Sequence, residues 1–337
     1  MLAGVHAESD RVDADGAGFV PMTAYRWEVR YAAGRLTVGS WTSLQHAPWD
    51  CGCRLHVARN AGAVVAAYPD EASLADDVIG SVADALGWSA TFADSVNASW
   101  PPLTGAVAFV TAQPTRMSGW FRTRKADDPD QDGYWAHPPP AYTYYLPGYD
   151  GAAAGIHHGG DFAGARIALG PDGLTDTTEQ LVHELVHYRL SSVATADGFL
   201  TTNAWVEEGV AQMVQQIYAG TTPEAAAAGD WLVGARELGV GITADRLDQD
   251  FHDRPPTAAQ LYAADRNTRF FWYQIAASVY EYLAVRYGLT VSIELATAAH
   301  AGRSPFELVP DPDRPSRMLS ATKVRQAWAA WVRQTYG

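Results

Sequence analysis

Hydrophobic and polar positions alternate in the first part of the chain and follow a helical period in the rest. Residues 25–38 and residues 54–68 each alternate about a short turn, which predicts two β-hairpins. Apolar runs at residues 106–111 and 165–169 predict buried strands, and the periodicity of residues 71–86 predicts an amphipathic helix. The hairpins, the strands and the helix between them are typical of an α+β fold with a small mixed β-sheet.

A mainly helical C-terminal half follows residue 175. Helical periodicity is strongest in four stretches: residues 224–237, 268–287, 293–301 and 321–336. We expect three parts along the chain: a flexible leader over residues 1–18, a β-rich segment over residues 19–55, and one large domain over residues 56–337. Residues 113–161 are rich in Pro, Gly, Tyr and Trp, so we expect a long irregular loop that shapes a substrate cleft.

The motif His-Glu-Leu-Val-His at residues 183–187 lies in a segment that reads as a buried helix. Asp176 and Glu179 resemble a capping box at its start. Histidines at positions i and i+4 share one helical face, so His183 and His187 can bind one metal ion, while Glu184 points about 100° away. At this composition, roughly 0.01 chance matches to the pattern are expected. The alternative is a helix with two partly buried, hydrogen-bonded histidines.

A catalytic zinc site needs a third protein ligand, and Glu207 and Glu208 lie downstream in a second predicted helix. Thr202 and Asn203 can cap that helix. Adjacent helical residues point about 100° apart, so one carboxylate can face the histidine helix while the other faces solvent or a residue that surrounds the metal ligands. Small and polar residues share the face of Glu208, namely Ala204, Ala211, Gln212 and Gln215. On this pattern alone, an exposed acidic pair remains the alternative.

The segments His-Glu-Leu-Val-His and Trp-Val-Glu-Glu-Gly-Val-Ala together resemble the gluzincin metallopeptidases of the peptidase MA clan, in particular the aminopeptidase-N-like family. The resemblance implies a gluzincin-like catalytic domain, a Zn²⁺ cofactor, and Glu208 as the third zinc ligand. Residues 273–279 are similar to the family's Tyr-Glu-Lys-Gly-Ala-Ser-Val segment, which implies that Tyr273 stabilises the oxyanion. Ile275 and Ala276 replace the Lys-Gly pair, and on pattern alone Tyr273 is equally well a core aromatic residue.

The implied activity is hydrolysis of peptide bonds in a peptide or protein substrate, by Glu184-assisted attack of a zinc-bound water. The family's Gly-x-Met-Glu-Asn segment, whose glutamate binds the substrate amine, is absent. Residues 164–170 stand in its place, and Arg166 is their only ionisable side chain. A cation repels the free amine of a substrate, so this segment favours an endopeptidase over an aminopeptidase. We expect substrate to extend along residues 165–169 as an edge strand.

Three other functions stay open at this point. The first is an aminopeptidase with an atypical amine anchor, and the second is hydrolysis of a non-peptide substrate by the same zinc chemistry. The third is a non-catalytic zinc-containing binding protein on a peptidase scaffold. Glu184 argues against this last function, because a purely structural zinc site needs no general base.

Composition narrows the class of protein further. The 337 residues are 47% hydrophobic, enough for a large core, and the net charge of −14 disfavours a nucleic-acid partner. No apolar run approaches the roughly 20 residues of a membrane span, so we expect no integral membrane segment. No signal peptide is visible at the N-terminus. The compartment stays open: secreted or cell-envelope if a signal peptide was removed, and cytoplasmic otherwise.

Two further motifs could bind metals. Cys51 and Cys53 are expected to form a local disulfide or to remain thiols, rather than to make a second zinc site. Asp128, Asp130 and Asp132 match the first half of a calcium-binding loop, with a solvated acidic turn as the alternative to Ca²⁺. Pro139 stands where such a loop needs its bidentate glutamate. Three histidines in polar loops are expected to be surface residues: His157, His158 and His252.

Overall fold

The computed structural model shows a mixed α+β protein. It describes residues 2–6, 22–32, 35–43, 48–100, 103, 105–120, 141–144, 166–191, 204–230, 242–261, 266–300, 304–311 and 313–337. The chain forms two compact units, one of residues 1–86 and 103–184, the other of residues 87–102 and 185–337. Among the described residues, no helix is long and apolar enough to cross a membrane.

A five-stranded mixed sheet is the centre of the first unit. Its strands lie in the order β4 (His56–Asn60), β5 (Ala63–Ala67), β6 (Ala106–Val110), β8 (Arg166–Leu169) and β7 (Ala141–Tyr144). Strands β5, β6 and β8 are parallel, whereas β4 and β7 run antiparallel to their neighbours. This sheet confirms the small mixed sheet expected from the sequence. Both β5 and β6 are buried throughout, which explains why they read as continuous apolar runs.

The antiparallel pair of β4 and β5 confirms the hairpin predicted over residues 54–68, although β5 is buried on both faces and does not alternate. Its turn holds Ala61 at φ 39° and Gly62 at φ 84°, the left-handed pair that a tight two-residue hairpin requires. Helix α1 (Ala72–Ser95) follows and is longer than the predicted residues 71–86.

The structure contradicts the expectation that residues 165–169 form a sheet edge. Strand β8 pairs with β6 on one side and with β7 on the other, so both of its hydrogen-bonding edges are occupied. Strand β7 and helix α2 (Pro114–Gly119) both lie within residues 113–161, where we expected no regular structure. The four residues of β7 are too few to show a clear alternation, and prolines precede them in the sequence.

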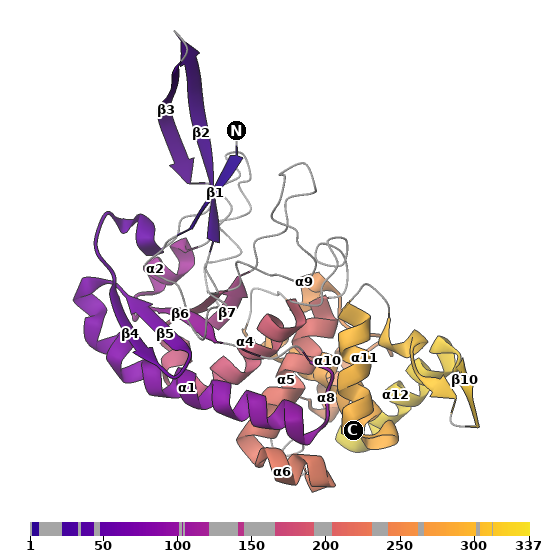
Figure 1. Cartoon of the computed structure of the whole chain (residues 1–337). Coiled ribbons are helices and arrows are strands. Elements are labelled where there is room, and N and C mark those ends of the chain that lie inside the picture. The colour runs from indigo at the N-terminus through magenta and orange to yellow at the C-terminus, as the bar shows by residue number, and fades with distance from the viewer. Residues whose placement is uncertain are drawn as a thin grey trace. The chain divides into compact units, whose positions relative to one another are not determined.

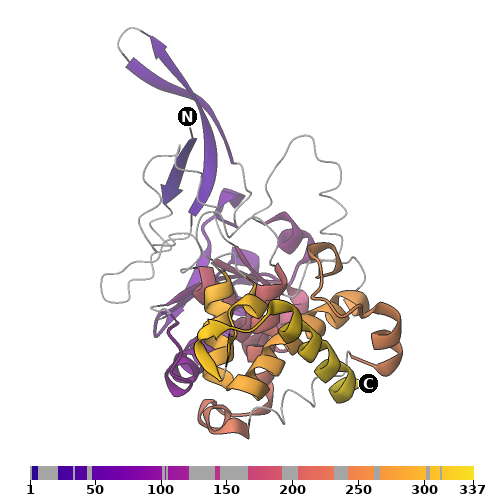
Figure 2. The same ribbon diagram turned by 90° about the vertical axis from the view of Figure 1, so that its right-hand side faces the viewer.

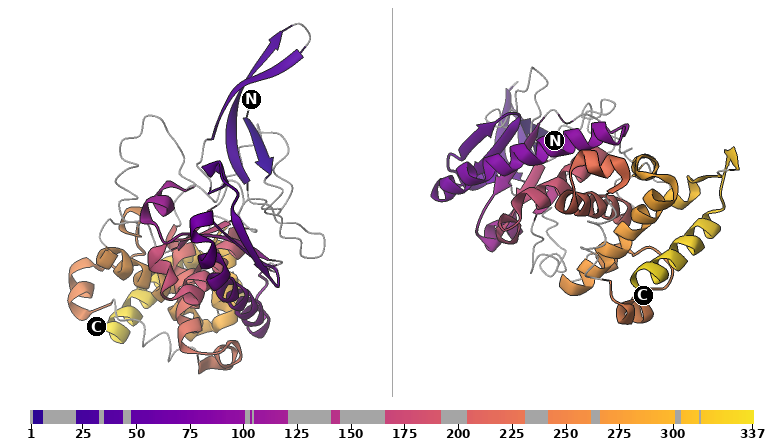
Figure 3. Two further views of the ribbon diagram at one scale, coloured as in Figure 1. Left: turned by 90° about the vertical axis from the view of Figure 1, so that its left-hand side faces the viewer. Right: turned by 90° about the horizontal axis from the view of Figure 1, so that it is seen from below.

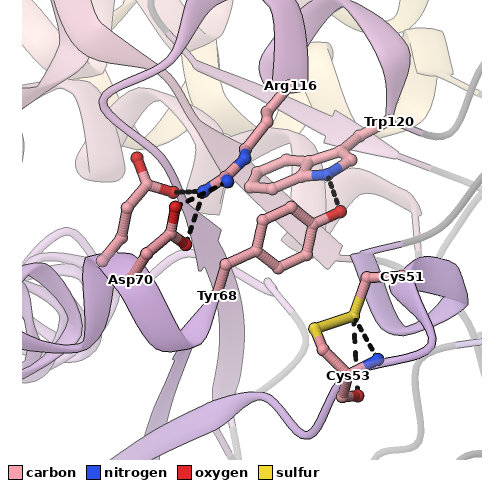
Figure 4. Close-up of a disulfide and its surroundings, with 7 residues drawn as sticks. Cys51, Cys53, Tyr68, Asp70, Arg116 and Trp120 are labelled. Atoms are coloured by element: carbon pink, nitrogen blue, oxygen red, sulfur yellow. Dashed lines mark hydrogen bonds and ion pairs between the residues drawn. A yellow bond between two sulfur atoms is a disulfide. The ribbon is translucent and has the colours of Figure 1, made fainter.

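One hydrophobic cluster fills one face of this sheet. Its buried members are Val64, Ala66, Tyr68, Val107, Phe109, Met117, Trp120 and Ala168. A polar network lies beside it, where β5 leads into helix η3 (Pro69–Glu71) (Figure 4). Arg116 of α2 donates to both carboxylate oxygens of Asp70 at 2.8 and 2.9 Å and to Glu71 at 2.7 Å. Its guanidinium also lies over the ring of Tyr68, so α2 is held to η3, directly before α1.

A separate three-stranded antiparallel sheet precedes these elements. It contains β1 (Leu2–His6), β2 (Met22–Ala32) and β3 (Arg35–Ser43). The hairpin of β2 and β3 confirms the prediction for residues 25–38 and forms a long twisted ribbon (Figure 2). Strand β1 lies within residues 1–18, so five residues of the expected leader are a paired strand.

Helices dominate the second unit, as the periodicity predicted. The central pair is α5 (Ala204–Gly220) and α10 (Arg266–Tyr287), and α11 (Leu289–His300) and α12 (Ala321–Tyr336) also pack on α10 (Figures 1 and 3). The shorter elements are α6 (Pro223–Ala225), η6 (Ala226–Asp230), α8 (Ala244–Asp250), α9 (Ala258–Leu261), η8 (Pro305–Glu307), β9 (Pro310–Asp311) and β10 (Arg314–Met318). The helix predicted over residues 224–237 is described only as far as Asp230. Helix α6 is followed by the π-helical turn η6, in which the backbone at Gly229 is not helical.

Candidate metal centre

Helix α4 (Thr177–Ser191) carries the His-Glu-Leu-Val-His motif, as the sequence predicted. Its apolar side chains are fully buried, namely Leu181, Val182, Leu185, Val186 and Leu190. The polar residues of the motif are buried as well: His183, Glu184 and His187 are 6, 4 and 7% exposed. Ionisable groups are rarely buried this deeply unless they have polar or charged partners, so the burial of these three side chains sets this part of α4 apart.

The end of α4 is fastened by a buried arginine. Arg189 is 2% exposed and donates to the hydroxyl and the carbonyl oxygen of Ser89 on α1, at 3.2 and 3.0 Å. Its guanidinium lies 5.6 Å from the ring centre of Trp100. Burial lowers the pKa of Arg189 to about 10, so the group stays cationic at neutral pH. These contacts limit rotation of the helix turn that carries His187.

Helix α5 is positioned by its first aromatic residue and by a glycine. Trp205 stacks on Phe306 with ring centres 5.9 Å apart and lies 6.4 Å from the ring of Tyr280 on α10. A Cβ atom at Gly209 would lie 2.6 Å from the carbonyl oxygen of Ala276 and 3.1 Å from Tyr280. Only glycine therefore permits this close approach of α5 to α10. Glu208, directly before the glycine, is held on a helix with little freedom to shift.

His183, His187 and Glu208 form a buried group that could hold a metal ion. One ligand atom of each residue lies within 4.8 Å of those of the other two. Nε2 of His187 and Oε2 of Glu208 are 3.4 Å apart. Two ligands bonded to a tetrahedral zinc ion at 2.0–2.1 Å are separated by about 3.4 Å, so this pair already has the spacing of zinc ligands. Two imidazoles and one carboxylate are a common donor set of catalytic zinc sites.

The neighbouring carboxylate reaches the same histidine from its other ring nitrogen. Oε2 of Glu207 lies 3.8 Å from Nδ1 of His187, and Glu207 is more exposed than Glu208. The two glutamates thus take different places, as their angular separation on one helix predicted. A carboxylate near the distal nitrogen of a metal-binding histidine is a frequent arrangement, because it favours the tautomer that leaves Nε2 free to bind.

Tyr273 lies near the start of α10 and is half-buried. It precedes Ala276 by three residues and Tyr280 by seven, so all three lie on one face of the helix. Ala276 and Tyr280 contact α5 at Gly209, which places Tyr273 on the side of α10 that faces α5. Burial raises the pKa of Tyr280 well above its ordinary value, with the charge of Glu207 adding to the effect, so Tyr280 stays a neutral phenol.

Buried glutamines on α5 and α10 were not predicted from the sequence. Gln216 on α5 donates to Gln274 on α10, and both side chains are almost completely buried. Gln212 and Gln215 on the same helix are 7% exposed. The signal was available in the sequence, because glutamines at helical spacing interrupt an otherwise apolar segment. The bond between Gln216 and Gln274 gives the interface of α5 and α10 a polar contact with a fixed direction.

Of the remaining candidate residues, those that the structure describes are not part of this group. Asp128, Asp130, Asp132, His157 and His158 lie outside the described residues. His252 is exposed, as expected. Cys51 and Cys53 form a disulfide, which excludes free thiols and a second zinc site at this position (Figure 4). No protein-family model matches the chain, and no curated protein and no solved structure matches it either.

Proposed function

We propose that this protein is a zinc-dependent hydrolase that cleaves internal peptide bonds, with a gluzincin-like arrangement of helices α4, α5 and α10. The observation that carries the proposal is the buried group of His183, His187 and Glu208, with Glu184 on the same helix as the histidines. The residue order His-Glu-x-x-His followed by a glutamate on the next helix is also the order in the gluzincin motif.

The three ligands suit zinc better than magnesium or calcium. Imidazole nitrogen is a poor ligand for those hard cations, which prefer six or more oxygen atoms, whereas zinc binds two histidines and one carboxylate well. When bound, Zn²⁺ supplies a Lewis acid that polarises the substrate carbonyl and lowers the pKa of a water molecule. Burial of His183, His187 and Glu208 keeps bulk water away from that charge and strengthens its effect.

Glu184 is the group that we assign as the general base. Its carboxylate would take a proton from the attacking water and later deliver it to the nitrogen of the leaving amine. Its side chain is only 4% exposed, so few water molecules compete for the carboxylate. The motif separates the roles by angle: His183 and His187 share one face of α4, whereas Glu184 points away from that face and stays available for the proton.

Tyr273 is the group that we assign to the oxyanion. A neutral phenol can donate a hydrogen bond to the developing negative charge without competing for the metal. Its position on the α5 side of α10 supports this role, because Glu208 lies on α5. Its partial exposure differs from the complete burial of Ile275, Ala276 and Ala277, as a side chain that meets substrate requires.

A substrate peptide has no free edge of β8 to pair with, because β7 already occupies the edge where it would bind. The preference for internal bonds still rests on the sequence. No carboxylate in residues 164–170 is available to bind a free α-amine, and Arg166 would repel it. Acetylation of a peptide's N-terminus should therefore leave cleavage intact. Stepwise release of N-terminal residues, abolished by acetylation, would instead indicate an aminopeptidase.

The decisive experiment compares the wild-type chain with Glu184→Gln. Metal content is measured by mass spectrometry, and turnover is measured on a diverse library of N-acetylated peptides. We expect about one zinc ion per chain in both proteins, with turnover only in the wild type. Equal turnover in both proteins would exclude Glu184 as the base. Bound zinc with no turnover in either protein would favour the non-catalytic zinc-containing binding protein.

A further inference from the structure

A cleft of about 590 Å³ lies between the segment that follows α8 and one face of α12. Its charged and polar lining is His252, Asp253 and Arg254 from the segment, and Arg325, Gln326 and Arg333 from the helix. Arg325, Ala329 and Arg333 follow one another at four-residue intervals, so they form a stripe along α12. The small Ala329 between the two arginines leaves room for a ligand.

Arg333 joins α12 to the segment that follows α8. It donates to Oδ1 of Asp253 at 3.0 and 3.3 Å and to the carbonyl oxygen of Phe251 at 3.2 Å. Its guanidinium lies 5.3 Å from the ring centre of Phe251, which in turn packs edge-on against Trp328 of α12. Asp253 has φ 54°, a left-handed conformation uncommon outside glycine, and these contacts stabilise it. The segment is therefore held in one shape that presents His252 and Arg254.

The remaining cations of the cleft have no acidic partner among the residues that the structure describes. Arg333 pairs with Asp253 at 3.0 Å and with Asp248 at 3.9 Å, whereas no described carboxylate forms an ion pair with Arg254 or Arg325, and both of these side chains are exposed. The cleft therefore presents two arginines without an acidic partner among the described residues, which is unexpected in a chain of net charge −14. Like charges held close together repel one another, and a bound anion removes that cost.

We propose that this cleft binds a phosphate group, either free or as the monoester of a small molecule. The planar guanidinium groups of Arg254 and Arg325 have the fork geometry that matches phosphate oxygens, and the amide of Gln326 adds a neutral donor. The volume of the cleft exceeds what inorganic phosphate alone fills, so a monoester gains contacts with Ala329 and Ala330. The site shares no residue with the metal-ligand group, and the proposal does not depend on peptide hydrolysis.

Calorimetric titration of the full chain with inorganic phosphate and with glycerol 3-phosphate tests this proposal. We expect saturable binding of at least one probe at near-neutral pH and low salt, with sodium chloride at matched ionic strength giving none. The double variant Arg254→Gln/Arg325→Gln should weaken binding at least about tenfold, because each charge-assisted hydrogen bond contributes that much. Tighter binding of the monoester would identify an esterified ligand, and tighter binding of phosphate would identify the free ion.

The control variant is Arg314→Gln/Arg317→Gln, which removes the same charge from exposed positions on β10 outside the cleft. It should bind the probes as the wild type does. Three results would overturn the proposal: no saturable binding of either probe, unchanged affinity in Arg254→Gln/Arg325→Gln, or equal weakening in both double variants. Arg333 is left intact in each protein because its contacts hold the segment in place.

Discussion

Replacement of Glu281 by glutamine should make the stability of this protein less sensitive to pH. Glu281 lies on α10, is 2% exposed, and accepts a hydrogen bond from the hydroxyl of Tyr336 near the end of α12. Burial raises the pKa of its carboxyl from 4.5 to about 7, and the bond from Tyr336 offsets only part of that rise. Between pH 4.5 and pH 7, Glu281 is therefore protonated in the folded protein and ionised in the unfolded chain.

The sign and size of the effect follow from the two pKa values. Because the folded pKa is the higher one, the contribution of Glu281 to stability is complete below pH 4.5 and is lost as the pH rises to about 7. At about 1.4 kcal/mol per pKa unit, the full difference is about 3 kcal/mol, most of it between pH 5 and pH 8. Glutamine has nearly the shape of the protonated carboxyl, and its side-chain oxygen can accept the same bond from Tyr336.

Urea unfolding at pH 5, 6, 7 and 8 measures this directly. The quantity of interest is the free energy of unfolding of Glu281→Gln minus that of the wild type, because other titrating groups contribute equally to both proteins and cancel. It should rise by about 2–3 kcal/mol from pH 5 to pH 8. Glu307→Gln, at an exposed glutamate, is the matched control and should show no trend. A flat difference for Glu281→Gln would refute the raised pKa.

Three further predictions concern the metal centre and the helices that carry it. Gly209→Ala should destabilise the protein by about 1–3 kcal/mol in urea unfolding, because the new Cβ meets the backbone of Ala276. The control Gly80→Ala on α1, where a Cβ has open space around it, should stabilise the protein by about 0.5–1 kcal/mol. Glu208→Gln should lose the zinc ion and Glu207→Gln should keep it when metal content is measured by mass spectrometry, and the reverse result would exchange their roles. Tyr273→Phe should lower kcat by roughly 10²–10³ at unchanged zinc content, whereas loss of folding in circular dichroism would show that Tyr273 is a core residue.

Local patterns predicted most of the secondary structure correctly. The hairpin of β4 and β5 could be predicted because the Asn-Ala-Gly turn and the strands on both sides of it belong to one short segment. Strand β7 could not, because four residues carry little periodicity and their pairing with β8 is set by the rest of the sheet. The same limit produced the wrong expectation about a peptide at the β8 edge. Which strands pair is a long-range property that alternation does not encode.

The candidate metal site was also predictable only in part from the sequence. The spacing of His183 and His187 fixes their common face because helix geometry alone relates them. The choice between Glu207 and Glu208 depends on how α5 is rotated about its axis, and this rotation is set by contacts that the sequence does not reveal. Trp205 and Gly209 make those contacts with their neighbours. The structure brings Glu208 close to the two histidines, in a buried group that could hold a metal ion.

The close packing of α5 on α10 also links the position of Glu208, the proposed zinc ligand, to that of Tyr273, the proposed oxyanion donor. Gly209 directly follows Glu208, and the residues that it contacts, Ala276 and Tyr280, share a helical face with Tyr273. A shift of α5 away from α10 would therefore move Glu208 relative to Tyr273, although neither side chain had changed. The buried bond between Gln216 and Gln274 opposes such a shift along the same interface. Breaking this contact should reduce turnover more than zinc content, because the proposed zinc ligands lie on α4 and α5, whereas Tyr273, the proposed oxyanion donor, lies on α10.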